Sequence, residues 1–244
     1  MDSDIPKPPV LQAVLFDLDG TLVDTAPDLA LALNRLLQEQ GKPELPYPVI
    51  RDQVSNGGNA LIELAFGIKV GEPEQPELRQ RLLDLYQEKV AEHSRLFTGL
   101  ESLLEEFERQ PVPWGIVTNK PRIYTDLLLR ELRIFPSVVV CPEDLGVSKP
   151  DPAPLLFAAR QLATPPEQCL YVGDHIRDIE AGRRAGMQTL VAGFGYISLQ
   201  DQPQHWGADF IASSVMELNS WIRHRLNDRF TPVSSGSAAP VAGL

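Results

Sequence analysis

The chain has 244 residues, of which 43% are hydrophobic and 23% are charged. This length allows one large domain or one domain that carries a smaller insert, and the composition excludes disorder over most of the chain. Lys and Arg number 22 and Asp and Glu number 33, which gives a net charge of −11. The acidic surplus argues against nucleic acid or an anionic membrane as the main partner, but it does not exclude a small anionic substrate, which responds to the local field of a cleft.

Segments that would direct the chain to a membrane are not expected. No apolar run approaches the roughly 20 residues that span a bilayer, and residues 1–10 lack the basic and apolar regions of a secretory signal. Cys141 and Cys169 adjoin apolar, strand-like runs and are expected to be buried, reduced thiols. No Cys/His cluster predicts a zinc site. We therefore expect a cytoplasmic protein.

The first predicted elements are one strand and a long helical segment. The apolar run over residues 13–18 predicts a strand. Thr25 as an N-cap, a proline in the first turn and Asp28 as an acid near the helix start predict a helix there. A second apolar stripe at helical spacing covers residues 78–86. Since no strand is predicted in between, residues 25–94 are expected to form a helical insert.

Strand-like and helix-like stretches alternate in the rest of the chain. Apolar residues at helical spacing over residues 100–107 predict a helix. Further strands are predicted over residues 113–118, 137–141, 169–172, 189–192 and 209–212. Nearly continuous apolar strands separated by helices predict a parallel sheet that is covered on both faces. We expect an α/β core from residues 10–24 and 95–229, with tails at residues 1–9 and 230–244.

Polar side chains follow several of the predicted strands. Ligands of parallel α/β sheets bind beyond the carboxyl ends of the strands. The side chains expected there are those of Asp17, Asp19, Thr118, Asn119, Lys149, Asp174 and Asp178. Carboxylates gathered in one crevice repel each other unless a cation holds them, and ligands that are all oxygen favour magnesium. Lysine, threonine and backbone amides are the donors that surround a phosphoryl group.

Four motifs of the chain resemble, in order, those of the haloacid dehalogenase-like hydrolases. They are DLDGT at residues 17–21, VTN at 117–119, SKP at 148–150 and GDHIRD at 173–178. The resemblance implies a Rossmann-like parallel sheet with an inserted helical cap of the C1 type. It also implies a magnesium-dependent phosphatase that hydrolyses a small phosphate monoester through an aspartyl-phosphate intermediate.

The resemblance implies catalytic roles for particular residues. Asp17 would be the nucleophile and Asp19 the general acid and base. Thr118 would donate a hydrogen bond to the phosphate, and Asn119 would lie at the substrate beside it. Lys149 would neutralise the charge of the phosphate and of Asp17.

The resemblance also implies a magnesium site. Its ligands would be Asp17, Asp174 and the backbone carbonyl of Asp19, with Asp178 completing the shell directly or through water. An alternative interpretation of Asp178 is an acid near a helix N-terminus, stabilised by the helix dipole. His175 lies within the same motif and is expected to line the site without binding the metal.

The substrate is expected to be recognised by the cap, because the core residues contact only the phosphoryl group. VTNKP is typical of phosphoglycolate phosphatases, and residues 50–61, 141–156 and 195–209 resemble bacterial N-acetylmuramic acid 6-phosphate phosphatases. The candidate cap contacts are Arg51, Ser55, Asn56, Gly57 and Gly58. The substrates of these two enzymes, 2-phosphoglycolate and N-acetylmuramic acid 6-phosphate, both carry a carboxylate, and Arg51 is expected to bind it. The two glycines are equally compatible with a plain loop.

Two other functions are compatible with the same residues. A sugar-phosphate mutase would share the core and the cap type, and its product would be an isomeric sugar phosphate. A phospho-receiver or binding module would use a similar acid cluster without turnover, although a cap of about 70 residues argues against it. A small-molecule phosphate ester is the expected partner, and the chain is expected to be a monomer or a homodimer.

Overall fold

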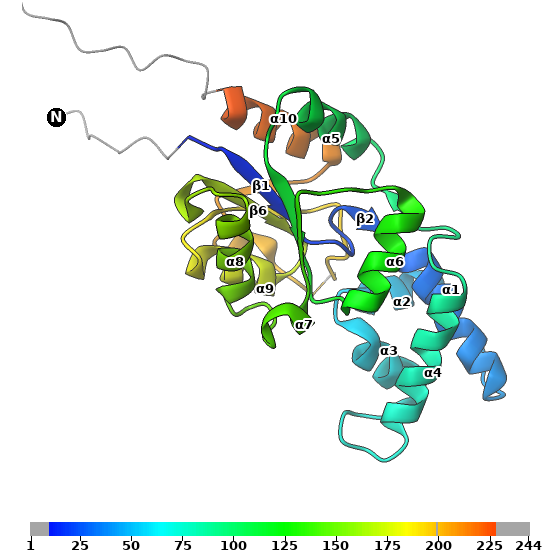
Figure 1. Ribbon diagram of the computed structural model, residues 1–244. Coiled ribbons are helices and arrows are strands. Elements are labelled where there is room, and N and C mark those ends of the chain that lie inside the picture. Colours follow the sequence, from blue (N-terminus) through cyan, green and yellow to red (C-terminus); the bar gives the residue numbers. More distant parts are fainter. Residues whose placement is uncertain (1–9, 199, 228–244) are drawn as a thin grey trace, which may run out of the picture.

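The computed structural model describes residues 10–198 and 200–227, so the tails predicted at residues 1–9 and 230–244 lie outside the described residues. Six parallel strands form one sheet in the order β5-β4-β1-β6-β7-β8 (Figure 1). The strands are β1 (Ala13–Phe16), β4 (Trp114–Val117), β5 (Val138–Val140), β6 (Cys169–Gly173), β7 (Gln188–Ala192) and β8 (Phe210–Ala212). Each overlaps a predicted strand, which confirms the α/β class.

Helices cover both faces of the sheet. Alternate residues of each strand point to opposite sides, and because both sets are apolar, both faces must be covered. In β1, Val14 and Phe16 belong to one hydrophobic cluster, and Ala13 and Leu15 belong to another. The first cluster includes residues of α5 (Leu100–Arg109), α6 (Arg122–Leu132) and α10 (Val215–Asn227), and the second includes residues of α8 (Ala153–Gln161) and α9 (Ile176–Arg184). The helices of the two clusters lie on opposite sides of the sheet in Figure 1.

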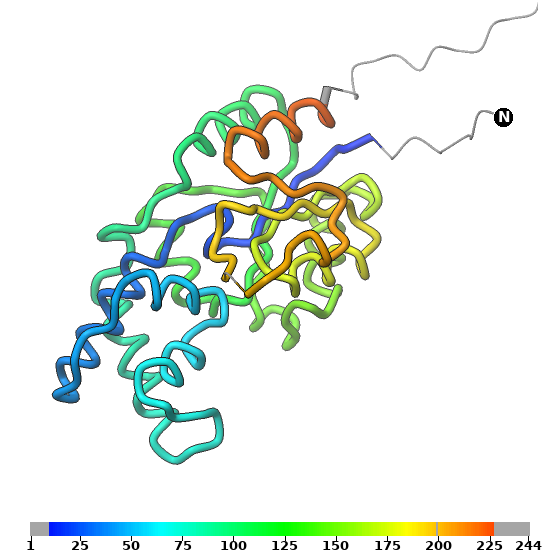
Figure 2. Tube along the Cα trace, turned by 180° about the vertical axis from the view of Figure 1, so that it is seen from behind, coloured from blue at the N-terminus to red at the C-terminus, as the bar shows by residue number. Residues whose placement is uncertain are grey.

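Four helices follow one another between the first and second strands of the sheet. They are α1 (Ala26–Glu39), α2 (Tyr47–Val54), α3 (Gly57–Phe66) and α4 (Gln75–Glu88). Prolines in the first turns of α1, α2 and α4 fit the fixed backbone angle that a helix start needs. Their apolar faces form a separate cluster, and Figure 2 shows the four helices gathered beyond one end of the sheet. Here we call these four helices the cap.

The two segments that connect the core with the cap pair with each other as a short antiparallel ribbon. It consists of β2 (Val23–Asp24) and β3 (Arg95–Leu96). Near it, the carboxylate of Asp28 accepts hydrogen bonds from the backbone N–H groups of His93 at 2.8 Å and Ser94 at 3.0 Å, and from the Ser94 hydroxyl at 2.6 Å. Asp28 therefore fixes the chain where it leaves the cap, which is more than the role of a helix-start acid.

Thr25 is the N-cap residue of α1, as predicted, but its side chain does not cap the helix. Its hydroxyl donates instead to Oδ1 of Asp19 at 2.6 Å. The helix start at this position is confirmed, but the residue that begins it is used to hold a carboxylate of the candidate site.

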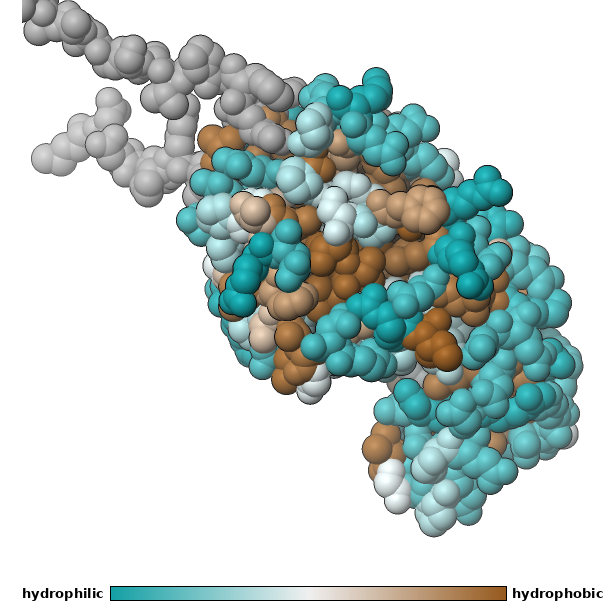
Figure 3. Space-filling model, in the orientation of Figure 1, coloured by the Kyte–Doolittle hydropathy of each residue, from teal (hydrophilic) through white to brown (hydrophobic). Residues whose placement is uncertain are grey.

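The surface differs between cap and core. Figure 3 shows that the visible surface of the cap is mainly hydrophilic, whereas hydrophobic side chains gather on the face where the edge strand β5 lies. Among the exposed residues near that strand, Phe135 has 76% of its surface accessible. The short α7 (Pro142–Leu145) and the 3₁₀ turns at Pro166–Gln168 and Pro203–His205 complete the fold. Within the described residues, no helix combines the length and the apolar character needed to cross a bilayer.

Candidate active site

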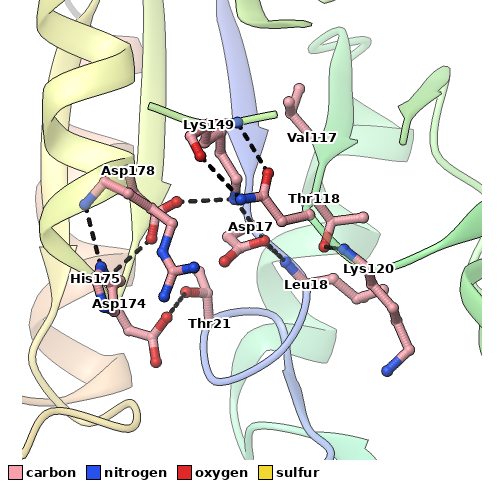
Figure 4. Close-up of polar contacts among 12 residues, drawn as sticks. Asp17, Leu18, Thr21, Val117, Thr118, Lys120, Lys149, Asp174, His175 and Asp178 are labelled. Atoms are coloured by element: carbon pink, nitrogen blue, oxygen red, sulfur yellow. Dashed lines mark hydrogen bonds and ion pairs between the residues drawn. The ribbon is translucent and has the colours of Figure 1, made fainter. Parts of the chain in front are cut away.

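The candidate site lies where the carboxyl ends of three neighbouring strands meet. β1 pairs with β4 on one side and with β6 on the other, all in parallel. Asp17 follows β1, Thr118 follows β4 and Asp174 follows β6, so the strand order brings the three side chains together (Figure 4). This is the position at which open α/β sheets bind ligands, and it confirms the placement of these residues at the strand ends.

Lys149 is the central cation of the site. Its buried ammonium lies 2.8 Å from Oδ1 of Asp17 and 2.8 Å from Oδ1 of Asp178. It also donates to the hydroxyl of Tyr171 at 2.8 Å, and that hydroxyl donates in turn to the carbonyl of Val117. Burial opposes the ammonium charge, but the two carboxylates outweigh burial and raise the pKa of Lys149. The three acceptors together match the three N–H donors of the ammonium.

Tyr171 was not among the predicted site residues. It lies in the middle of β6, where an aromatic residue in an apolar run is typical of a strand that only packs into the core. Its hydroxyl accepts a hydrogen bond from Lys149, and no pattern in the sequence distinguishes that role from packing.

Three carboxylates lie close enough to hold one metal ion. One carboxylate oxygen each from Asp17, Asp174 and Asp178 lies within 4.8 Å of the others. Burial, with repulsion from Asp178, raises the pKa of Asp17 to about 6, although Lys149 opposes the shift. Burial and the charge of Asp17 raise the pKa of Asp174 to about 7. A divalent cation would favour the ionised form of all three groups, and their oxygen donors fit magnesium.

Asp178 has two further contacts that explain its orientation. Its Oδ2 accepts a hydrogen bond from the backbone N–H of His175 at 3.0 Å, as part of a capping box at the start of α9. Its Oδ1 lies against Lys149. The interpretation of Asp178 as an acid at a helix N-terminus is therefore confirmed, and its role at the site stays a prediction that its place in the carboxylate cluster supports.

Asp19 lies outside the three-carboxylate cluster. Its Oδ1 accepts hydrogen bonds from Thr25 at 2.6 Å and from the ammonium of Lys120 at 2.9 Å. Burial alone would lower the pKa of Lys120, but Asp19 and Tyr86 raise it by more, so the ammonium is charged. Lys120 was not predicted as a site residue, although it directly follows the VTN motif.

A cavity of about 250 Å³ separates these core residues from the cap. Asp17, Asp19, Thr118 and Lys149 line it from the core. The cap side is lined by Ser55, Asn56, Gly57, Gly58, Asn59, Arg79, Leu82 and Tyr86, among others. Four of the five predicted cap residues are thus at the cavity.

Two predicted substrate contacts have other partners in the structure. The guanidinium of Arg51 donates to the carbonyls of Phe194 at 3.2 Å and Gly195 at 2.9 Å, and it lies outside the residues that line the cavity. In the structure Arg51 connects α2 to the segment after β7, and its expected contact with a substrate carboxylate stays a prediction that this geometry does not favour. Asn119 lines the cavity, but its side-chain amide binds the backbone N–H and carbonyl of Lys149, which positions the lysine.

The cap loop reaches the carboxylate cluster through one hydroxyl. Ser55 donates to Oδ2 of Asp174 at 3.1 Å. Arg177 donates to the carbonyl of Ser55 at 2.7 Å, and the ring of His175 lies 3.3 Å from Oδ1 of Asn56. Burial and Arg177 lower the pKa of His175 to about 4, so the ring is neutral near pH 7. These contacts seat the loop between α2 and α3 on the core.

Arg79 and Arg177 line the cavity and were not predicted. Arg177 is part of the GDHIRD motif, so its position could have suggested it. Arg79 precedes Leu82 by three residues and Tyr86 by seven, which places the three side chains on one face of α4. An arginine in the register of an otherwise apolar face is the signal that could have identified it.

Comparisons with known proteins agree with this geometry. The family model described as "Haloacid dehalogenase-like hydrolase" matches residues 14–192. The chain is 44% identical over 210 residues to the N-acetylmuramic acid 6-phosphate phosphatase of Pseudomonas aeruginosa, covering 85% of this chain and 93% of the relative. It is 38% identical to a phosphoglycolate phosphatase of Xanthomonas campestris pv. campestris, with coverages of 85% and 94%.

A solved structure shares the fold over the same range. The predicted phosphoglycolate phosphatase of Haemophilus somnus 129PT aligns with a TM-score of 0.77 and 26% identity, covering 88% of this chain and 99% of that one. The matched family model covers more than half of the chain, and the curated relatives named above are phosphatases. The chain therefore belongs to the haloacid dehalogenase-like hydrolases and is a phosphoric monoester hydrolase of that family.

Proposed function

We propose that this phosphatase hydrolyses N-acetylmuramic acid 6-phosphate, with magnesium, through an aspartyl-phosphate on Asp17. The observation that carries the proposal is that one cavity is charged on its core side and has apolar and aromatic side chains on its cap side. The core supplies the acid cluster and Lys149, and the cap and α6 supply apolar and aromatic residues such as Leu82, Tyr86 and Tyr124. An amino sugar has carbon faces to place against such a surface, whereas a two-carbon acid has none.

In the first step, the carboxylate of Asp17 attacks phosphorus and the sugar alkoxide leaves. Asp17 is held before the reaction, since its Oδ1 accepts from the backbone N–H of Leu18 at 2.7 Å and contacts Lys149. Asp19 gives its proton to the leaving oxygen. The hydroxyl of Thr118 accepts from the N–H of Lys120 at 3.1 Å, which leaves its own proton for a phosphoryl oxygen.

In the second step, water attacks the phosphorus of the aspartyl-phosphate and inorganic phosphate leaves. Asp19, now ionised, removes the proton from that water. Lys149 balances the negative charge of the transferring group and of Asp17 in both steps. Asp17, Asp174, Asp178 and the backbone carbonyl of Asp19 would hold the magnesium ion, which supplies further charge neutralisation when bound.

The cell compartment follows from the thiols. Both cysteines are buried and unpaired. Free thiols in that state fit a reducing compartment, so we infer that the reaction takes place in the cytoplasm.

The second candidate substrate is 2-phosphoglycolate. It is supported by the name of the relative from Xanthomonas campestris, and the same core chemistry would act on it. The test is a comparison of kcat/KM for N-acetylmuramic acid 6-phosphate and 2-phosphoglycolate with purified enzyme and magnesium. We expect the amino sugar phosphate to be preferred by at least about 10-fold, and a preference for 2-phosphoglycolate would contradict the proposal.

The products distinguish the remaining functions in the same experiment. Release of inorganic phosphate in amounts equal to the dephosphorylated sugar supports a phosphatase. An isomeric sugar phosphate without free phosphate would indicate a mutase. A stable phosphoprotein without turnover would indicate a receiver or binding module.

A further inference from the structure

One cation at the cavity has no partner within the described part of the chain. Arg79 of α4 lines the cavity, and its Nε is buried without a hydrogen bond. Neither a hydrogen bond nor a salt bridge links its guanidinium to another described residue. A buried donor without an acceptor costs free energy, so an anionic group that enters the cavity and accepts from Arg79 would recover that cost.

The other cations at the cavity already have acceptors: the two lysines are ion-paired with carboxylates, and Arg177 donates to neutral oxygens of the cap. Lys149 contacts Asp17 and Asp178, and Lys120 contacts Asp19. Arg177 donates to the carbonyl of Ser55. Among the described cations that line the cavity, Arg79 is therefore the one whose guanidinium has no hydrogen-bond acceptor, so an anionic group that enters away from the phosphoryl position can bind it without breaking an existing contact.

Arg79 stands on the cap side of the cavity. It packs beside Gly58, since a Cβ built at Gly58 would be in van der Waals contact with it, 3.7 Å from Cγ and 3.8 Å from Nε of Arg79. Asp17 and Lys149 line the same cavity from the core. A substrate that bridges the two sides would thus place its phosphate against the core and a second group against α4.

We propose that Arg79 binds the carboxylate of the substrate and thereby selects phosphate esters that also carry a carboxylate. The proposal rests on the proposed function, because it concerns the same cavity and reaction. A guanidinium offers two parallel N–H donors that match the two oxygens of a carboxylate. A substrate without that group leaves Arg79 unpaired in the complex, which is the basis of the discrimination. Arg79 takes the role that the sequence suggested for Arg51.

The test compares two sugar phosphates that differ only in the carboxylate-bearing group. N-acetylmuramic acid 6-phosphate carries a lactyl ether, and N-acetylglucosamine 6-phosphate lacks it. Arg79→Gln should lower kcat/KM for the first by about 10- to 100-fold, as expected for losing a charged hydrogen-bonded pair. It should change kcat/KM for the second by less than about twofold. Arg79→Lys should fall in between, because a lysine keeps the charge without the paired donors.

The matched control is Arg81→Gln. Arg81 lies two residues further along α4, and its guanidinium pairs with Glu39 on the exposed side of the cap, away from the cavity. This control should leave both sugar phosphates within about twofold of wild type. Inhibition by inorganic phosphate provides a second readout, since phosphate binds at the core. Its inhibition constant should be the same in Arg79→Gln and in wild type.

The outcomes separate this proposal from the proposed function. Equal losses of Arg79→Gln on both sugars would show that Arg79 only supports the cap, and the proposal would be wrong. If wild type prefers the acidic sugar and Arg79→Gln keeps that preference, the assignment of Arg79 is wrong while the proposed function stands. If wild type hydrolyses neither sugar phosphate, the proposed function is wrong. Arg79 is then tested with 2-phosphoglycolate, which carries a carboxylate, and ethyl phosphate, which lacks one, by comparing the losses of kcat/KM that Arg79→Gln causes for the two.

Discussion

The carboxylate of Asp19 is held by a cation and a hydroxyl that come from different parts of the chain. Lys120 follows β4, and Thr25 stands at the start of α1. Both groups contact the same oxygen, Oδ1, and the carboxylate still lines the cavity. Asp19 is thus held at the cavity, close to the start of α1, where the leaving group of a bound substrate can reach it.

Replacing Asp19 should affect substrates according to their leaving groups. Asp19→Asn removes the proton donor, so cleavage of an alkyl phosphate such as the sugar phosphate should slow by about 100- to 10,000-fold. Release of p-nitrophenol from its phosphate should slow far less in a single turnover, because this phenolate leaves without protonation. Rapid-mixing measurements of both reactions provide the test. Equal losses in the first step would show that Asp19 is not the acid.

The sequence predicted the site residues that belong to short motifs and missed those that act through packing. Asp17, Lys149 and Asp178 stand in motifs whose order and spacing carry the information. Tyr171 lies in an apolar strand, where nothing in the local sequence distinguishes a site contact from core packing. Arg79 interrupts the apolar face of α4, and that is the only signal for it in the sequence. Their roles arise from the strands and helices that the fold places next to them.

At the scale of elements, α2 and the loop that joins it to α3 are attached to the core by several contacts. Arg51 reaches the segment after β7, and its guanidinium also lies 4.8 Å from the ring centre of Tyr196. Tyr196 in turn donates from its backbone N–H to Asp174 at 2.8 Å. The same segment therefore contacts both the cap and the carboxylate cluster, so cap position and site geometry are connected.

Arg51→Ala should weaken this connection without changing substrate preference. We expect kcat/KM to fall by about 3- to 30-fold, a typical cost for losing charged hydrogen bonds to carbonyls. The factor should be the same for the acidic sugar phosphate and for an uncharged aryl ester of phosphate. Arg35→Ala is the control, because Arg35 pairs with Glu88 on the exposed cap surface. A loss confined to the acidic substrate would mean that Arg51 does bind the carboxylate.

The long elements were predicted better than the short ones. The six sheet strands are buried apolar runs, which a sequence displays directly. β2 and β3 have two residues each and depend on pairing between positions about 70 residues apart, so no local pattern indicates them. The N-cap position at Thr25 was predicted correctly, but the sequence could not show that its hydroxyl bonds to Asp19 and not to the helix backbone.

At the scale of the whole molecule, the charge of the cavity is opposite to that of the chain. The chain carries a net charge of −11, yet the cavity is lined by four cationic side chains, Arg79, Lys120, Lys149 and Arg177, against the two carboxylates of Asp17 and Asp19. Cations gathered in a cleft raise the local concentration of an anionic substrate, even on an acidic protein. This distribution agrees with a small phosphate ester as the partner.

The folded state should protect both thiols from reagents. Burial raises the pKa of Cys141 to about 11 and the pKa of Cys169 to about 12. Since the thiolate is the reactive form, a thiol reagent at pH 8 should modify neither cysteine in the native protein and both after denaturation in urea. Rapid modification of either thiol in the native state would contradict this burial.

The same two shifts predict how stability depends on pH. Above about pH 9 the thiols of the unfolded chain ionise while the folded ones keep their protons, so the folded state binds more protons and loses stability as pH rises. The urea midpoint should therefore be lower at pH 10 than at pH 8. A midpoint that rises over this range would contradict the prediction.

The central claim is that the phosphoryl group passes through Asp17, and a trapping experiment tests it most directly. Enzyme, magnesium and substrate labelled with ³²P are mixed and quenched in acid within milliseconds, and the labelled peptide is identified. The label should be found on the peptide that contains Asp17, and it should be absent after EDTA treatment and in Asp17→Asn, which should also release no phosphate. Label on another residue, or phosphate release by Asp17→Asn at the wild-type rate, would contradict the mechanism.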